Sequence, residues 1–428
     1  MRELVHMDEG RRAAAPTFRR CGSLLFAAVV ALLVGSSCQI EDMSEGRAPI
    51  AREDDFGPPP PAKSRLDLLA KLGRAPRFLV GHGNDLPGEE KGFDFEQAGI
   101  YTLPVTLDVH YVYLSGLHGE RSESGPGWPD YDPDGTFVAK VGAIAVNRGV
   151  LPMFTLYQAA ARGENELGLL GDPDFMTKYW FGVRLLFERL RELDRPAMVH
   201  VEPDFWGFAQ QAARRTWEPS DVPAIVGPLV PECRDLPEDV GGMGRCIVRL
   251  ARALAPKVAI GLHASGFGYV DGPRRVARFL AACGALETDF IVVDALDRDA
   301  GCFEAGTDPR CQRSDRDLYW DETNARSPSF REHLAWTSII HERLGLPVFW
   351  WQMPLGVPSD VPGGRPKHYR DNRVRYFFAH VREFEEAGGF GAAFGVGAPS
   401  QTDITTDGGQ FARAVTRYYE APVAISAP

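Results

Sequence analysis

Two short segments place ionisable residues directly after runs of β-branched residues. The first is Val199-His200-Val201-Glu202-Pro203-Asp204 and the second is Ile291-Val292-Val293-Asp294. Alternate side chains of a strand share a face, so His200 and Glu202 are expected on one side of the first strand, facing the interior of the sheet. Carboxyl groups on an otherwise apolar strand are costly to bury, and burial raises their pKa. Carboxyls in such surroundings are suited to acid–base and nucleophilic chemistry.

Hydrolysis of a glycosidic bond is one reaction that uses two carboxyls. One protonates the leaving oxygen, and the other attacks the sugar carbon or activates water, at about 5.5 Å or 6.5–9.5 Å respectively. We predict Glu202 and Asp294 as this pair, with Asp204 and Asp297 in reserve. Glu202 could instead be paired structurally with a neighbouring strand, and Asp294 could cap a turn.

Aromatic residues accompany these carboxyls. Trp350-Trp351-Gln352 ends another apolar run, and Trp206 follows Asp204 closely. Flat rings stack on the faces of sugars, and an amide hydrogen-bonds to hydroxyls. Neighbours on a strand point in opposite directions, so one tryptophan of the pair is expected to pack against helices and the other to point inward. Trp180 lies in a helical pattern and is expected in the core.

The elements that position these residues alternate regularly along the chain. Short apolar runs predict strands at 78–80, 105–113, 153–156, 198–201, 258–262, 290–293, 348–351 and 391–396. Helical patterns lie between them, at 174–193, 240–254, 272–285, 328–344, 372–387 and 409–419. Eight strands with crossovers predict an α/β fold, a single (β/α)8 TIM-type barrel over residues 76–428. An open doubly wound sheet is the alternative, but the segment after the first strand, at 81–85, lacks a complete Gly-rich phosphate loop.

In a parallel barrel, function lies where the strands end. Reading those ends predicts a set of residues that contact a carbohydrate substrate: His82, Asp108, His110, Tyr157, Gln158, His200, Trp206, His263, Asp297, Trp351 and Gln352. We expect no cofactor in this reading.

The segment around Glu202 resembles known glycosidases. Val201-Glu202-Pro203-Asp204, downstream of Gly163-Glu164-Asn165-Glu166, is similar to a segment of family-six cellulases, which hold an acidic Asp after the preceding strand. This chain has Tyr157-Gln158 at that place. Glu202 also matches the acid of the large clan of barrel glycosidases, whose nucleophile position falls here on Gln352. The resemblance implies a secreted barrel glycoside hydrolase, or a sugar-binding barrel without activity.

The amino terminus reads as an export signal. Residues 1–37 combine arginines with an apolar run from Ser23 to Val34, shorter than the roughly 20 residues that span a bilayer. Cys38 follows two serines, as in a lipoprotein cleavage box, and is the expected lipidation site. Residues 38–75 are expected to form a flexible tether. We therefore expect an exported protein in the periplasm or at the cell surface, touching membrane only through this anchor.

The remaining cysteines suit an oxidising compartment. Cys233 with Cys246, and Cys302 with Cys311, could each close a local disulfide. Cys283, in a helical stretch, is expected to be a buried thiol.

Composition excludes some functions and leaves two alternatives open. A net charge of −11 argues against nucleic-acid binding, which needs a basic face. His, Glu and Asp at the strand ends could instead bind a divalent metal in a barrel hydrolase. A surface protein that binds glycan without cleaving it is the third class.

Overall fold

The computed structural model describes residues 57–83, 99–122, 125–266, 271–295, 298–311 and 319–426 of the 428-residue chain. The predicted signal at 1–37 and the lipidation site Cys38 lie outside the described residues, as does Asp297. The fold below is that of the described chain from residue 57 onward.

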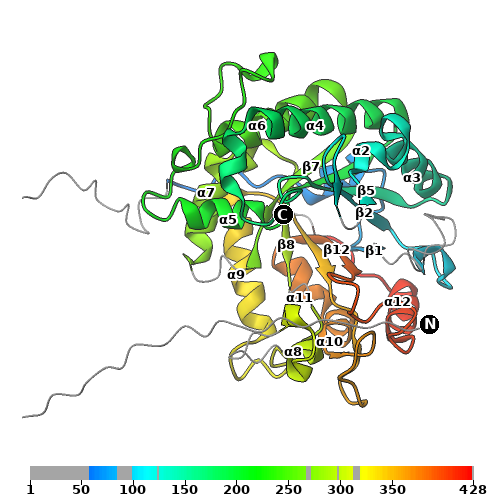
Figure 1. Ribbon diagram of the computed structural model, residues 1–428. Coiled ribbons are helices and arrows are strands. Elements are labelled where there is room, and N and C mark those ends of the chain that lie inside the picture. Colours follow the sequence, from blue (N-terminus) through cyan, green and yellow to red (C-terminus); the bar gives the residue numbers. More distant parts are fainter. Residues whose placement is uncertain are drawn as a thin grey trace, which may run out of the picture. The chain divides into compact units, whose positions relative to one another are not determined.

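Eight parallel strands close into a barrel, with the helices around them (Figure 1). In order around the barrel the strands are β1 (Leu79–Gly83), β2 (Val109–Ser115), β5 (Leu151–Tyr157), β6 (Ala197–Val201), β7 (Val258–Ala264), β8 (Phe290–Asp294), β9 (Val348–Met353) and β12 (Gly389–Gly395). β12 pairs with β1 and closes the ring. The (β/α)8 barrel predicted from the sequence is confirmed, and each of the eight predicted strands overlaps an observed one.

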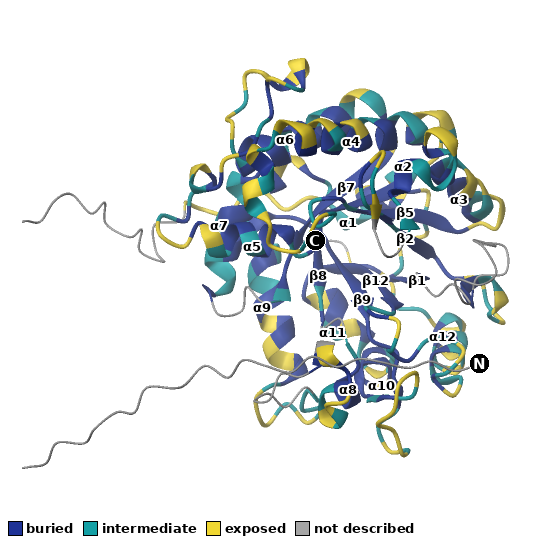
Figure 2. Ribbon diagram, viewed as in Figure 1, coloured by how far each residue is buried: buried dark blue, intermediate teal, exposed yellow. Residues whose placement is uncertain are grey.

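Helices surround this barrel, and most of them bury one face in its core (Figure 2). They are α1 (Arg65–Lys71), α2 (Trp128–Tyr131), α3 (Thr136–Asn147), α4 (Pro173–Leu193), α5 (Phe205–Ala212), α6 (Val240–Leu254), α7 (Pro273–Ala282), α8 (Ala300–Ala305), α9 (Phe330–Leu344), α10 (Arg373–Ala379), α11 (Val381–Glu386) and α12 (Gln410–Glu420). Local signals explain their ends: Asp172 caps α4, and Ser329 forms a capping box at α9. Gly345 adopts φ 62° just past α9, a conformation that glycine reaches without strain. None of the described helices has the length and apolar character needed to span a bilayer.

The loops contain two short two-stranded sheets. One pairs β3 (Arg121–Ser122) with β4 (Gly125–Pro126), and the other pairs β10 (Val357–Pro358) with β11 (Arg370–Asp371). Short 3-10 helices lie in the loops; they include η3 (Gly99–Thr102), η5 (Leu167–Gly171), η7 (Pro231–Cys233) and η10 (Pro309–Cys311).

Part of the expected tether is a docked helix. Within the range 38–75, Ser64 caps α1, and Leu68, Leu69 and Leu72 are buried in the core. Lys71 pairs with Asp289, which directly precedes β8. The expectation of a flexible chain is therefore wrong for residues 64–72, because the leucine spacing gives α1 an apolar face that packs at the amino ends of the strands.

β2 begins four residues later than predicted, at Val109 rather than Val105. Asp108 therefore precedes its strand and lies at the amino end of the barrel. It accepts hydrogen bonds from Arg77 at 2.7 and 3.0 Å, from the Val80 N–H at 3.0 Å and from the Tyr419 hydroxyl at 2.9 Å. Burial raises the pKa of Asp108, against the opposing effect of Arg77. The predicted substrate contact at Asp108 is wrong, since this carboxylate ties the carboxyl-terminal helix α12 to the base of β1.

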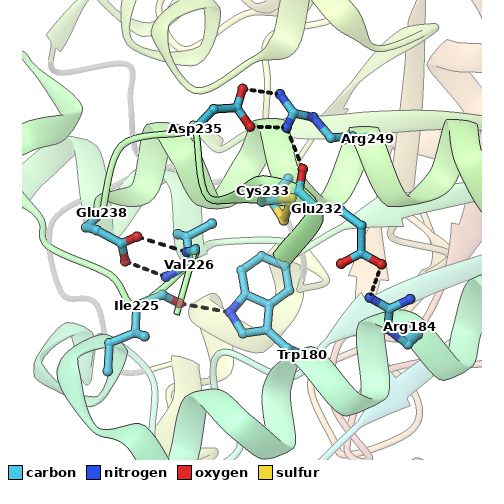
Figure 3. Close-up of a disulfide and its surroundings, with 11 residues drawn as sticks. Trp180, Arg184, Ile225, Val226, Glu232, Cys233, Asp235, Glu238 and Arg249 are labelled. Carbon is cyan, nitrogen blue, oxygen red and sulfur yellow. Dashed lines mark hydrogen bonds and ion pairs between the residues drawn. A yellow bond between two sulfur atoms is a disulfide. The ribbon is translucent and has the colours of Figure 1, made fainter. Parts of the chain in front are cut away.

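Both local disulfides form. Cys233–Cys246 joins η7 to α6, and Cys302–Cys311 joins α8 to η10, while Cys283 is a buried free thiol. Figure 3 shows the first disulfide beside Trp180 of α4, whose Nε1 donates to the Ile225 carbonyl at 2.8 Å. Trp180 is a core residue, as its helical position predicted.

Candidate active site

Rings gather inside the carboxyl-terminal half of the barrel around Trp351 of β9. The centroid of the Trp351 ring lies 5.9 Å from Tyr111 and 5.5 Å from Tyr113, both of β2. Glycines on neighbouring strands leave space for this cluster: a Cβ at Gly395 would lie 2.0 Å from the Tyr111 hydroxyl. As strand alternation predicted, Trp350 points the other way and donates to His333 of α9 at 2.8 Å.

Three adjacent strands contribute a hydrogen-bonded line beside Trp351. His200 Nε2 lies 2.8 Å from His263 Nδ1, and His263 Nε2 lies 3.1 Å from Asp294 Oδ1. At the far end, the Thr155 hydroxyl lies 3.4 Å from His200 Nδ1. The two imidazoles stack with centroids 5.0 Å apart. The structure therefore brings together three of the predicted site residues, His200, His263 and Asp294.

Asp294 is the carboxylate of this line that reaches solvent, with 19% of its side chain exposed. Its Oδ1 also accepts the Gly266 N–H at 2.7 Å. Burial alone would raise the pKa of Asp294, but the hydrogen bonds from His263 and Gly266 bring it below the ordinary value. Asp294 is therefore ionised near neutral pH, the state required of a base or nucleophile.

A polar edge completes the mouth on the β2 and β5 side. Gln352 Nε2 donates to the Tyr113 hydroxyl at 2.9 Å and to the Val396 carbonyl at 3.0 Å. Tyr157 lies edge-on to Tyr113 with centroids 5.8 Å apart, and its hydroxyl donates to Glu164 at 3.0 Å. Burial, with nearby carboxylates, raises the pKa of Tyr157. Both phenols therefore stay protonated and can hydrogen-bond to a polar ligand.

Asp204 opens onto a pocket beside these tyrosines. The pocket is open to solvent and is lined by residues of the loop after β5 and of α5, including Tyr157, Glu164, Glu166, Asp204 and Phe208. No basic side chain is among its lining residues. Asp204 is half-buried and has φ 66°. Such strained backbone persists only where the surroundings hold it, and it concentrates at functional sites.

Glu202 does not face the barrel interior, contrary to the alternation argument. Its carboxylate is fully buried and accepts backbone N–H groups from Gln158 at 3.1 and 3.2 Å and from Ala159 at 3.0 Å, near Tyr179 of α4. The cause is its φ of 49°, which breaks the strand after Val201 and turns the side chain toward the loop after β5. Burial raises the pKa of Glu202 to about 8, in spite of these hydrogen bonds.

Four other predicted contacts are turned away from the mouth. Trp206 is 1% exposed and donates to the Val201 carbonyl, so it packs in the core and offers no face to a sugar. The Gln158 amide is buried between Trp128 and the Tyr179 carbonyl. His82 packs against Phe411 of α12, and His110 bonds to Tyr101 of η3 at 3.0 Å.

The two histidines of β1 and β2 therefore point outward under the helices, not into one cleft with His200 and His263. Burial, and the neighbouring His82, lower the pKa of His110 to about 3. Within the described part of the chain, no group of three His, Cys, Asp or Glu side chains is arranged to hold a metal ion. His200 and His263 use their ring nitrogens on each other and on Asp294 and Thr155, so the donors present do not fit the metal-dependent alternative.

Sequence reasoning missed the pairing of His200 with His263 and the contribution of Thr155. A signal was present, since each histidine lies near the end of an adjacent apolar strand on an inward position. The register that aligns His200 with Gly261 decides the contact, and register between distant strands is not written in either segment.

Comparisons with known proteins identify no family. No protein-family model matches the chain, and no curated protein sequence matches it. Among solved structures, the chain is similar to GH26C from Muricauda sp. MAR_2010_75 (10% identity, TM-score 0.45, 84% of this chain and 88% of that one). It is also similar to a hyperthermophilic endo-β-1,4-glucanase (13%, 0.44, 79% and 94%) and to D-allulose 3-epimerase from Methylomonas sp. (13%, 0.44, 81% and 97%). Likenesses at this level say nothing about substrate or reaction.

Proposed function

We propose that this chain is a glycoside hydrolase that acts on an oligosaccharide or polysaccharide. The observation that carries the proposal is Asp294, an ionised carboxylate at the mouth of the barrel, hydrogen-bonded by His263 and aligned with Trp351 of the neighbouring strand. Glycosidic hydrolysis needs an ionised carboxylate beside the sugar carbon, and the half-buried Tyr113 and Tyr157 offer hydroxyl groups to a sugar.

The second carboxyl comes from the segment after β6. The sequence favoured Glu202, and its pKa of about 8 would keep it protonated at neutral pH, as a general acid requires. Its two oxygens, however, are enclosed by backbone donors, and the side chain has no exposed surface. Asp204 is half-buried and lines the open pocket. We therefore place Asp204 ahead of Glu202 as the partner of Asp294, and assign Glu202 to holding the loop after β5.

Three isosteric variants test this assignment. The chain and its D294N, D204N and E202Q variants are assayed for reducing sugar released from a panel of soluble α- and β-linked glycans. D294N and D204N should each lose about 1000-fold or more in kcat, as expected when an acid or base is removed. E202Q should lose less than about tenfold. Full activity of D294N would contradict the proposal, and an inactive E202Q beside an active D204N would return the acid role to Glu202.

Glycan binding without cleavage is the second candidate, favoured by Gln352. An amide at this end of β9 cannot act as a nucleophile, and its Nε2 is already engaged with Tyr113 and Val396. Calorimetric titration with the same glycans separates the two functions: saturable binding with no sugar released over a day supports a binding protein.

We further propose that the chain is exported and anchored through Cys38. The proposal rests on the arginines and short apolar run of residues 1–37. The two disulfides support an oxidising compartment. Labelling with a fatty-acid analogue in a bacterial host tests it: the full chain should take up label and its C38A variant should not. Equal labelling of both, or of neither, would contradict the anchor.

A further inference from the structure

The line from Thr155 through His200 and His263 to Asp294 has one consistent arrangement of protons when both imidazoles are neutral. A carboxylate can only accept, so the proton between His263 and Asp294 belongs to His263 Nε2. A neutral His263 then has a lone pair on Nδ1, and His200 Nε2 must donate across the 2.8 Å contact. His200 Nδ1 is left as an acceptor, facing the Thr155 hydroxyl.

The surroundings favour this neutral arrangement. Both imidazoles are fully buried. The edge of the Trp351 ring covers them, with centroids 4.7 Å from His200 and 5.7 Å from His263. Burial and the neighbouring His263 lower the pKa of His200 well below its ordinary value. His200 is therefore a neutral donor over the ordinary pH range.

We propose that His200 is a positioning residue that acts through His263 to keep Asp294 ionised and in place. The proposal deepens the proposed function and rests on it for the role of Asp294. With His200 donating to Nδ1, His263 is held as the Nε2–H tautomer and always presents a proton to Asp294 Oδ1. Without that donor, His263 can move its proton to Nδ1, and its Nε2 lone pair would then face the carboxylate.

Other charged groups near Asp294 come from the helices. His333 of α9 lies near Asp294, and burial lowers the pKa of His333 to about 3, so His333 is neutral above that pH. Arg373 of α10 donates to the carbonyl of Ala295, next to Asp294. Because His333 is neutral above about pH 3, above that pH the His200–His263 pair is what can shift the titration of Asp294.

The experiment compares three substitutions at His200 in the full chain. Gln places an amide N–H where the imidazole has Nε2, so H200Q keeps the donor to His263. Leu in H200L has no donor, and Asn in H200N has one that is too short to reach His263 Nδ1. H200N keeps a polar side chain inside the barrel, so the proposal can still be tested with H200N if H200L does not fold. Near-ultraviolet circular dichroism verifies the tertiary structure of each.

Two readouts are measured. The first is the acid limb of kcat/KM against pH, which should move up by about one pH unit in H200L and H200N and stay at the wild-type position in H200Q. The second is the 15N chemical shifts of His263, which report its tautomer without any substrate: Nε2–H in the wild type and H200Q, and a mixture or the Nδ1–H form in H200L and H200N.

The outcomes are distinct. If the chain cleaves no glycan but the His263 tautomer follows the donor at position 200, the positioning role stands and the proposed reaction fails. If folded H200L and H200N keep both the tautomer and the acid limb of the wild type, or if H200Q behaves like them, the inference is overturned.

Discussion

Ala159 donates its backbone N–H to the buried carboxylate of Glu202 at 3.0 Å, which ties the loop after β5 to the end of β6. That loop lines the acidic pocket and carries Glu164. Glu202, which the sequence suggested as a catalytic residue, therefore holds in place the loop that lines the pocket. Its raised pKa has a consequence for stability that can be measured apart from activity.

Glu202→Gln should flatten the dependence of stability on pH. Glu202 in the folded chain holds its proton up to about pH 8, against an ordinary pKa of 4.5. Between these values the folded state binds more protons than the unfolded state, so stability falls as pH rises from about 5 to 8. Gln cannot ionise and removes this contribution. Thermal unfolding at pH 5, 6, 7 and 8 should show a smaller fall in Tm for E202Q than for the wild type, and parallel curves would contradict the assignment.

Asp108→Asn should destabilise the chain without changing catalysis. It breaks a largely buried pair with Arg77 and weakens the bonds to Val80 and Tyr419, at a cost of about 2–4 kcal/mol. Asp235→Asn is the matched control: Figure 3 shows its pair with Arg249, which is exposed and should contribute much less, because solvent screens such pairs. Urea denaturation measures both. A loss of activity in folded D108N would place Asp108 at the site after all.

Trp206→Phe and Tyr157→Ala should separate core packing from ligand contact. Trp206 is enclosed, so its truncation should cost about 1–3 kcal/mol in unfolding free energy and leave KM unchanged. Tyr157 lines the open pocket, so Y157A should raise KM about tenfold or more, the loss of roughly 1.4 kcal/mol of binding. Substrate titrations with a cleaved glycan give both KM values. An unchanged KM in Y157A would remove this pocket from the substrate path.

Removing the Cys233–Cys246 disulfide by double alanine substitution should lower stability by about 2–3 kcal/mol. The disulfide closes a loop over a sequence separation of 13 residues, and a loop of that length restricts the unfolded chain by this amount. Cys302–Cys311 spans 9 residues and should contribute slightly less. C283A serves as the control: reductant should lower the Tm of C283A as much as that of the wild type, since Cys283 is a free thiol. A Tm that does not respond to reductant would contradict both disulfide contributions.

Local patterns along the chain carried the prediction of the barrel. Apolar runs such as 290–293 and 348–351 became strands because a parallel strand covered on both faces must be apolar almost throughout. The cap residues Asp172 and Gly345 and the paired cysteines act over a few residues, so their neighbours in sequence suffice to place them.

The directions in which side chains point at the strand ends were harder to predict from the sequence. Asp108 was misplaced because the start of β2 depends on pairing with β1 and β5 and not on its own residues. Glu202 was misplaced because a single positive φ reverses the side chain that follows a strand. His82 and His110 were predicted to point into the barrel. On β1 the residues that alternate with His82 are Gly81 and Gly83, and these lie against Val109 and Tyr111 of β2.

By itself the sequence determined the fold class, the eight strands and the two disulfides, because hydrophobic periodicity and short loops act locally. Only the tertiary structure decided which ionisable groups meet. His200, His263 and Asp294 come from segments far apart in the chain, and their hydrogen bonds exist because the barrel aligns three strands in one register. Glu202 and Asp108 carry equally suggestive sequence contexts, but a positive φ after β6 and the late start of β2 leave their carboxylates holding a loop and a helix in place.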